Sequence, residues 1–335
     1  MTAKQDKSIV RSLSVARLRD IGLVLFIVIL SIFIQFRNSQ FLTISNLNNM
    51  LINACIMGIL AVGMMMVIIT GGIDLSIGST LALSGMSAGL FVRDNPDAPV
   101  IIAVLIGIAV GMAAGFVNGL LVGKGGVLPL IATLGMMNVY RGLTYIIAGG
   151  AWVSAHQMND GFKAISFYNI LGINSMIWIA AIVFLIAYFF LNYTRTGRRV
   201  YAVGSNYEAS QISGTNVDNI QILVYTIMGG VSGLSGILWV SRFASAQGDT
   251  AQGFEMNVIA ACVLGGVSIT GGSGKVPGVA LGTLLLGILR NSLPLLKVSP
   301  FWQDAIYGVI IMIAIIVNVM VKRTVDKRNL QRRHI

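Results

Sequence analysis

The sequence carries very little charge for its length. Of 335 residues, 10% are charged and 56% are hydrophobic, and the mean hydropathy is +0.83. Soluble domains carry about 25% charged residues. So few charges do not cover the surface of a soluble protein of this size. The composition therefore excludes a soluble fold and predicts an all-α, polytopic membrane protein.

Histidine, cysteine and proline are scarce as well, which limits the available chemistry. The two histidines, His156 and His334, lie in a predicted outer loop and in the C-terminal tail, so no metal cluster or catalytic triad can be assembled around them. Cys55 and Cys262 lie in apolar stretches without the spacing of a metal site or disulfide framework. We expect no catalytic residue, no metal site and no cofactor bound by this chain.

Apolar runs of near-spanning length recur along the whole chain. A helix needs about 20 apolar residues to cross the hydrocarbon core of a bilayer. The runs predict about ten transmembrane helices, and the two short runs, 76–92 and 254–270, are expected to be tilted, broken or only partly inserted. The runs lie at 21–36, 47–69, 76–92, 99–122, 127–149, 174–192, 220–240, 254–270, 276–296 and 303–321.

Basic residues orient these spans. The net charge is +11, and most of the 23 basic residues fall in three segments, 1–20, 193–219 and 322–335. Basic residues that flank spans are held on the cytoplasmic side. We therefore expect a cytoplasmic N-terminal tail at 1–20, a transmembrane domain at 21–321 with a long inner loop at 193–219, and a basic cytoplasmic tail at 322–335. This distribution along membrane flanks argues against a nucleic-acid partner.

A glycine-rich segment at 271–275 looks like part of a phosphate-binding loop. The full pattern needs a Gly five residues before Gly274 and a Ser or Thr after the Lys. Ile269 and Val276 occupy these two positions. We therefore predict a turn between helices and no ATP binding by this chain itself.

That turn has a counterpart earlier in the sequence. Residues 269–272, which include Gly271 and Gly272, repeat the Ile-Thr-Gly-Gly sequence of residues 69–72. Many transporters contain internal repeats. The two turns indicate either such a repeat or the same turn chemistry used twice.

Asp74 and Ser76 follow the first turn, at the head of a predicted helix. A carboxylate followed by Ser in this position can cap free backbone N–H groups and interacts favourably with the helix dipole. The alternative is a contact of Asp74 with substrate or with a neighbouring subunit.

Two further features lie inside predicted spans, a row of glycines and a cation. Gly111, Gly115 and Gly119 recur every four residues and share one helix face, which is typical of close helix packing in membranes. Arg141 lies within a span beside Asn138. A buried cation there normally faces the bundle interior or a polar cavity. Arg141 therefore indicates pore lining or a structural pair, with snorkelling to the outer surface as the alternative.

Several segments together resemble one family, the permease subunits of bacterial ABC importers for ribose-like sugars, grouped with branched-chain amino acid permeases. The similar segments are distributed in family order over the chain beyond the N-terminal tail, which makes the combination specific. They are Gly71–Ser79, Ala132–Gly142, Thr196–Asn206, Gly253–Asn257 and Val263–Gly274. The resemblance implies a type II-like ABC importer permease architecture in a bacterial cell (inner) membrane.

The resemblance also implies a cytoplasmic coupling helix, which in these importers carries the pattern Glu-Ala-Ala, three residues, Gly. Glu208, Ala209 and Gly214 stand in this relation, with Ser210 in place of the second Ala. The loop that contains them would dock into a groove of a partner ATPase. Basic residues lie close by in the same loop: Arg195, Arg198 and Arg199.

By the same resemblance, the chain would act with a second permease subunit, identical or different, two ATP-binding subunits and an external substrate-binding protein. A monosaccharide or a sugar-like small molecule would pass between the two permeases. Thr133, Met137, Asn138 and Arg141 are the expected lining of this path. Arg242 and Glu255 are expected to dock the binding protein.

The main alternative is a secondary transporter of a small polar solute driven by protons or sodium. Such proteins usually place ionisable groups at mid-membrane to carry the coupling ion. In the predicted topology nearly all 12 acidic residues fall in loops or at span ends. This distribution favours the ATP-driven importer.

Overall fold

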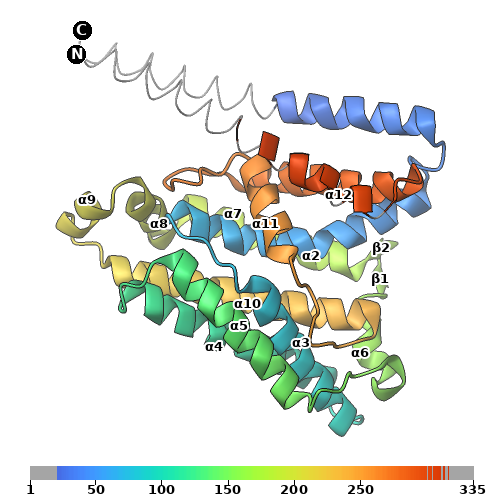
Figure 1. Ribbon diagram of the computed structural model, residues 1–335, viewed down its shortest axis with the longest axis horizontal. Coiled ribbons are helices and arrows are strands. Elements are labelled where there is room, and N and C mark those ends of the chain that lie inside the picture. The colour runs from blue at the N-terminus through green and yellow to red at the C-terminus, as the bar shows by residue number, and fades with distance from the viewer. Residues whose placement is uncertain (1–20, 300, 304, 311, 314–315, 317–335) are drawn as a thin grey trace.

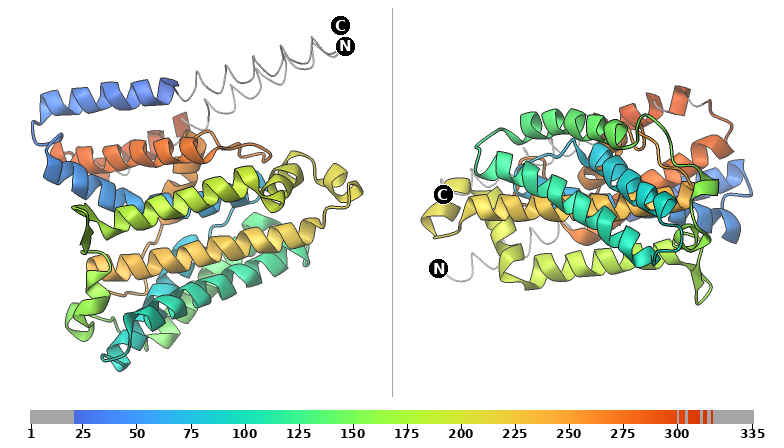
Figure 2. Two further views of the ribbon diagram at one scale, coloured as in Figure 1. Left: turned by 180° about the vertical axis from the view of Figure 1, so that it is seen from behind. Right: turned by 90° about the horizontal axis from the view of Figure 1, so that it is seen from below.

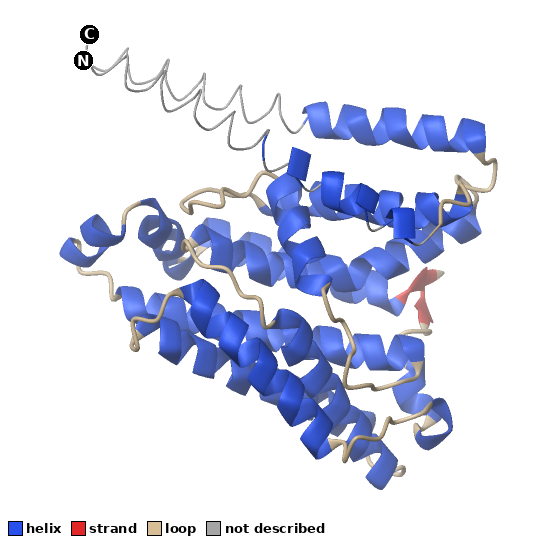
Figure 3. Cartoon of the chain, viewed as in Figure 1, coloured by secondary structure: helices blue, strands red, loops and turns tan. Residues whose placement is uncertain are grey.

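The computed structural model describes residues 21–299, 301–303, 305–310, 312–313 and 316, so the two predicted tails lie outside the described residues (Figure 1). In this part of the chain the secondary structure is almost entirely helical (Figure 3). A hairpin of two short strands, β1 (Asn169–Ile170) and β2 (Ile173–Asn174), forms the sheet found there.

Six helices of the described residues are long and apolar enough to cross a membrane. Each overlaps one predicted apolar run within a few residues, which confirms those runs as helices. They are α2 (Ile44–Ile69), α4 (Val100–Gly123), α5 (Pro129–Ile147), α7 (Ser175–Tyr193), α10 (Val217–Phe243) and α12 (Val276–Leu295).

The remaining predicted spans correspond to shorter or less apolar helices. An apolar helix covers Ile21–Arg37, and α11 (Phe254–Leu264) has only 11 residues. The helix α3 (Ile77–Asp94) has 18 residues and follows the short run predicted at 76–92. The last predicted run lies partly outside the described residues. A total of about ten crossings therefore stays a prediction.

Helix α2 forms the centre of the bundle. Every residue from Ala54 to Ile69 is buried, and α7, α10, α11 and α12 all pack against it. A helix that is apolar on every side suits a position surrounded by other helices rather than by water. The largest hydrophobic cluster of the described residues is built around it.

Helices α4 and α10 lie side by side along most of their length (Figure 2). Gly111 and Gly115 of α4 face Gly229 and Gly233 of α10, and a Cβ added to Gly115 would lie 2.2 Å from the carbonyl oxygen of Tyr225. Only hydrogen at these positions permits such an approach of two backbones. The four-residue glycine spacing in the sequence is thus explained by helix packing.

Two segments interrupt the helices on one face of the bundle. After α2 the chain runs without helical structure through residues 70–76 before α3 begins, and after α10 residues 244–253 run back toward α11 (Figure 1). Both segments lie next to α5, since Thr133 bonds to the first and Arg141 to the second. Irregular backbone at membrane depth occurs where it is buried in protein or lines a polar cavity.

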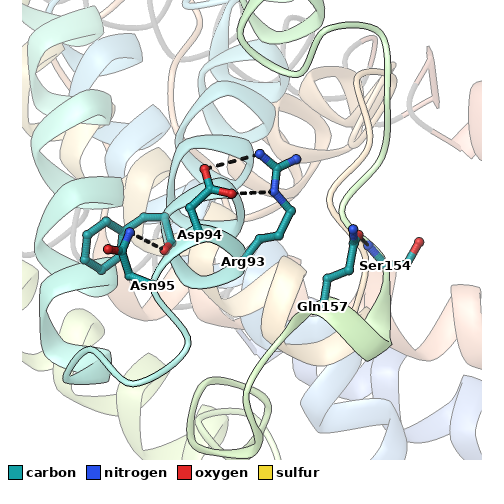
Figure 4. Close-up of polar contacts among 6 residues, drawn as sticks. Arg93, Asp94, Asn95, Ser154 and Gln157 are labelled. Carbon is teal, nitrogen blue, oxygen red and sulfur yellow. Dashed lines mark hydrogen bonds and ion pairs between the residues drawn. The ribbon is translucent and has the colours of Figure 1, made fainter.

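The two ends of the bundle differ in structure. The short helices α8 (Arg195–Ser205) and α9 (Tyr207–Ile212) form one end, while α6 (Asp160–Ala164) and the hairpin β1–β2 form the opposite end (Figures 1 and 2). At the latter end α3 finishes with the ion pair between Arg93 and Asp94, 2.7 Å apart, close to the turn at Ser154 and Gln157 (Figure 4). The loops at 150–173 and 193–219 are therefore on opposite sides, as the topology predicted.

Candidate functional site: the coupling loop and the face of α5

The predicted coupling loop folds into two short exposed helices. Thr194 caps α8 by accepting a hydrogen bond from the Gly197 N–H at 2.9 Å, and Asn206 caps α9 through the Ala209 N–H at 2.9 Å. One side of α8 is buried, including Val200 and Val203. The other side carries the exposed guanidinium groups of the loop: Arg195, Arg198 and Arg199.

Helix α9 carries the Glu-Ala-Ser pattern, with Ser210 buried and the first two residues of the pattern exposed. Glu208 and Ala209 are exposed, and Ile212 is 89% exposed. Gly214 ends the helix with φ at +82°, a left-handed conformation that glycine adopts without steric cost. An apolar side chain and a carboxylate are therefore exposed together on this short helix.

Asp74 is buried and hydrogen-bonded within its own chain. Its carboxylate accepts the backbone N–H of Ser76 at 2.8 Å and the Ser76 hydroxyl at 2.6 Å. The Asn118 amide of α4 donates to the Ser76 oxygen at 2.8 Å, and the Tyr140 hydroxyl lies 3.1 Å from the Asn118 carbonyl oxygen. Asp74 thus binds the N–H of Ser76, the residue that precedes α3, rather than a free N–H group of the first helical turn, and residues of α4 and α5 extend the network.

Thr133 of α5 is fully buried against the segment 70–76. Its hydroxyl accepts the Leu75 N–H at 3.1 Å and donates to the Pro129 carbonyl oxygen at 2.8 Å. The structure therefore places Thr133 on the side of α5 that holds the broken segment. It lies away from the exposed side of the same helix.

Arg141 binds the second irregular segment. Its guanidinium donates to the carbonyl oxygens of Gly248 and Thr250, both at 2.7 Å. Asp249 and Glu255 are close enough to interact with it electrostatically. The sequence left pore lining, a structural pair or snorkelling open for Arg141. These contacts correspond to a structural pair, in which the partners of Arg141 are two main-chain carbonyls.

Asn138 lies on the exposed side of α5. Its only hydrogen bond among the described residues goes to the Leu134 carbonyl of its own helix, at 3.1 Å. Gly135 and Gly142 lie on the same side, and a Cβ added at either would meet nothing within 4 Å. Met137 is half-buried at the edge of this surface. An exposed amide is unfavourable against lipid.

The two residues expected to dock a binding protein have different neighbours. Arg242, in the last turn of α10, stacks over the ring of Phe167 at 5.3 Å and borders a cavity of about 300 Å³ between α2, α10, α11 and α12. Glu255 lies beside the start of α3, where a Cβ on Gly78 would be 3.2 Å from its carboxylate.

The two Ile-Thr-Gly-Gly turns meet in space. Gly71 and Gly271 both have φ at +84°, and each N–H donates to the carbonyl three residues earlier at 2.9 Å. The turns diverge at the next residue, where the Gly272 N–H donates to the Ile69 carbonyl at 2.9 Å. Gly271 and Gly272 thus connect the two halves of the chain.

Sequence reasoning missed Asn118 and Gly204. Asn118 is a single amide inside the apolar run predicted at 99–122, and a polar group in such a run was the signal that it has a partner. Gly204 lies in a mixed polar helix, where glycine spacing gives no sign of tertiary contact. Its close approach to Ile69 and Gly272 depends on how distant segments pack together.

The described residues form a bundle of apolar helices with two broken segments and exposed short helices at one end. This arrangement is that of a multi-pass membrane protein, and broken helices of this kind occur in many transporters. The family model described as "Branched-chain amino acid transport system / permease component" matches residues 46–315. The chain belongs to this permease family.

Curated relatives cover most of the chain. The ribose import permease protein RbsC of Escherichia coli (strain K12) is 41% identical over 281 residues, which are 83% of this chain and 87% of the relative. RbsC of Bacillus subtilis (strain 168) is 40% identical over 90% of this chain and 93% of the relative. The L-arabinose transport system permease protein AraH of Escherichia coli (strain K12) is 38% identical over 83% of each chain. No solved structure matches the chain.

Proposed function

We propose that this chain is the transmembrane permease subunit of an ATP-driven importer that carries a monosaccharide or a sugar-like small molecule. Family membership and similarity over most of the chain to permeases named for ribose and arabinose support this function. The exposed helix α9, with Glu208 and Gly214 in coupling-helix spacing, is the observation that carries it.

The proposed partners are those of an importer of this kind, and the exposed surfaces of the chain suggest where they dock. ATP would be bound by two separate subunits that dock on α8 and α9, and the solute would be delivered by an external binding protein. A second permease subunit would face the exposed side of α5, so that Asn138 and Met137 border the path between the two. In this arrangement both termini lie in the cytoplasm.

The experiment is reconstitution of the chain in liposomes with its ATPase and binding protein, identified by purification from the native membrane. Sugar should accumulate only when ATP and both partners are present. The isolated chain should neither hydrolyse ATP nor concentrate sugar. Accumulation by the isolated chain under a proton or sodium gradient would establish the ion-coupled alternative instead.

The coupling loop provides a more specific test. Replacing Glu208 by Ala, or Gly214 by Ala, should reduce sugar uptake by about tenfold or more while the chain still inserts into the membrane. The second change forces a residue with a Cβ into the left-handed region, at about 1–2 kcal/mol. The control is Asp97→Asn in the loop between α3 and α4. Uptake at the control level in both coupling-loop variants would refute the docking role of α9.

A further inference from the structure

The end of α8 is packed against both Ile-Thr-Gly-Gly turns at once. Gly204 lies so close to the first turn that an added Cβ would be 1.6 Å from the Ile69 carbonyl oxygen and 2.7 Å from the Gly272 nitrogen. These are contacts with backbone, which cannot rotate away as a side chain does. Position 204 is therefore the place where the loop 193–219 touches the turn at 69–72 and the turn at 269–274 together.

Further contacts hold α8 in this place. The Tyr201 hydroxyl donates to the Gly274 carbonyl oxygen at 2.9 Å. A Cβ on Gly271 would lie 2.9 Å from the Gly204 oxygen, and one on Gly272 would lie 2.9 Å from the Ser205 Cα. We define the coupling junction as Tyr201, Gly204 and Ser205 with the turns at 69–72 and 269–274.

One side of the junction leads directly into the membrane interior. The turn at 69–72 continues through residues 73–76, which bond to Thr133 of α5 and, through Ser76, to Asn118 of α4. The other turn continues into α12 at Val276. Helix α8 is therefore connected through these contacts to α5 on one side and to α12 on the other.

We propose that the coupling junction is the point at which movement of the ATPase-docked loop reaches both halves of the permease, and that Gly204 and Tyr201 are positioning residues for this step. The inference rests on the proposed function, since it needs an ATPase on α8 and α9. Coupling of this kind travels through packed groups and requires a direct test of energetic coupling.

The test uses the complete importer in liposomes and measures sugar transported per ATP hydrolysed. Gly204→Ala requires α8 to move by about 1.8 Å, the difference between a 1.6 Å approach and ordinary contact from 3.4 Å. We expect this variant to lower the ratio at least tenfold, and Tyr201→Phe to lower it about threefold. In both variants the ATPase should still co-purify at the wild-type level.

Matched controls make the same chemical changes elsewhere. Gly22→Ala places its Cβ in open space, and Tyr168→Phe removes a hydroxyl from a side chain that is 65% exposed. Both should keep the wild-type ratio. If the Gly204→Ala variant does not assemble into the complete importer, the transport ratio of Tyr201→Phe alone tests the inference.

Three results would overturn the inference. They are an unchanged ratio in Tyr201→Phe, a parallel loss of transport and ATP hydrolysis, and a loss of ATPase binding, which would make Tyr201 a docking residue. A wild-type complex that accumulates no sugar refutes the proposed function instead, so the two failures are distinguishable.

Discussion

The contact between α4 and α10 allows one substitution to be worked through in detail. In Gly115→Ala the new methyl would lie 2.2 Å from the Tyr225 carbonyl oxygen, whereas ordinary contact begins at 3.4 Å. The two backbones must separate locally by about 1.2 Å. A gap of 0.5–1 Å already loses a quarter to a half of the dispersion attraction between facing atoms.

Two opposing effects set the net cost of this substitution. Overpacking typically costs about 1–3 kcal/mol. Replacing Gly by Ala inside a helix contributes about 0.5–1 kcal/mol in the other direction. Overpacking should win, because the glycines of this contact follow one another along α4 and a local separation disturbs its neighbours. We expect a net loss of roughly 1–2 kcal/mol for Gly115→Ala.

This loss of stability is measured by heating the purified protein in detergent and following its unfolding by size-exclusion chromatography. Gly142→Ala is the matched control, since its methyl meets nothing within 4 Å and only the helix-propensity gain applies. The double variant Gly115→Ala/Gly229→Ala should lose less than the sum of the single variants, because the first separation makes room for the second methyl. A Gly115→Ala protein as stable as Gly142→Ala would refute the reasoning.

Two further predictions concern the loops. Arg141→Met removes both hydrogen bonds to the segment 244–253, at a cost of about 3 kcal/mol for a charged donor. Protease cleavage within this segment should therefore accelerate. The control Arg93→Met loses only an exposed ion pair and should leave the cleavage rate unchanged. At α6 the hydrogen bond from Lys163, whose Nζ is 2.8 Å from the Asp160 carboxylate, holds the pKa of Asp160 below its ordinary value. The contribution of this pair to stability is therefore complete above about pH 4 and is lost as the pH falls further. Lys163→Ala should speed amide hydrogen exchange in α6 at pH 7 and have a smaller effect at pH 3. An effect of the same size at both pH values would contradict this assignment.

Much of the helical framework was predictable because it depends on local apolar runs. The six helices of the described residues that are long and apolar enough to cross a membrane begin and end within a few residues of runs such as 99–122 and 174–192. The family resemblance, carried by segments such as Gly71–Ser79, was confirmed by the family match and by the relatives. These features are readable because hydrophobic length and short motifs are written in consecutive residues.

Contacts between distant residues were not predictable in the same way. The sequence suggested a cap for Asp74 but gave no sign that Asn118 would reach Ser76 across 42 positions. The roles expected for Arg141 were open until its two carbonyl partners were located. Whether the path runs along Asn138, and whether Arg242 and Glu255 contact a binding protein, stay predictions because both depend on a second molecule.

The bonds of Arg141 bear on how such proteins diversify. Because the Arg141 guanidinium donates to the main-chain oxygens of Gly248 and Thr250, these two bonds do not require a particular functional group in the loop. Gln252, which is exposed, can then be replaced without loss of these two bonds. Single substitutions at such exposed positions can therefore alter the chemical character of this segment while the backbone that Arg141 anchors stays constant.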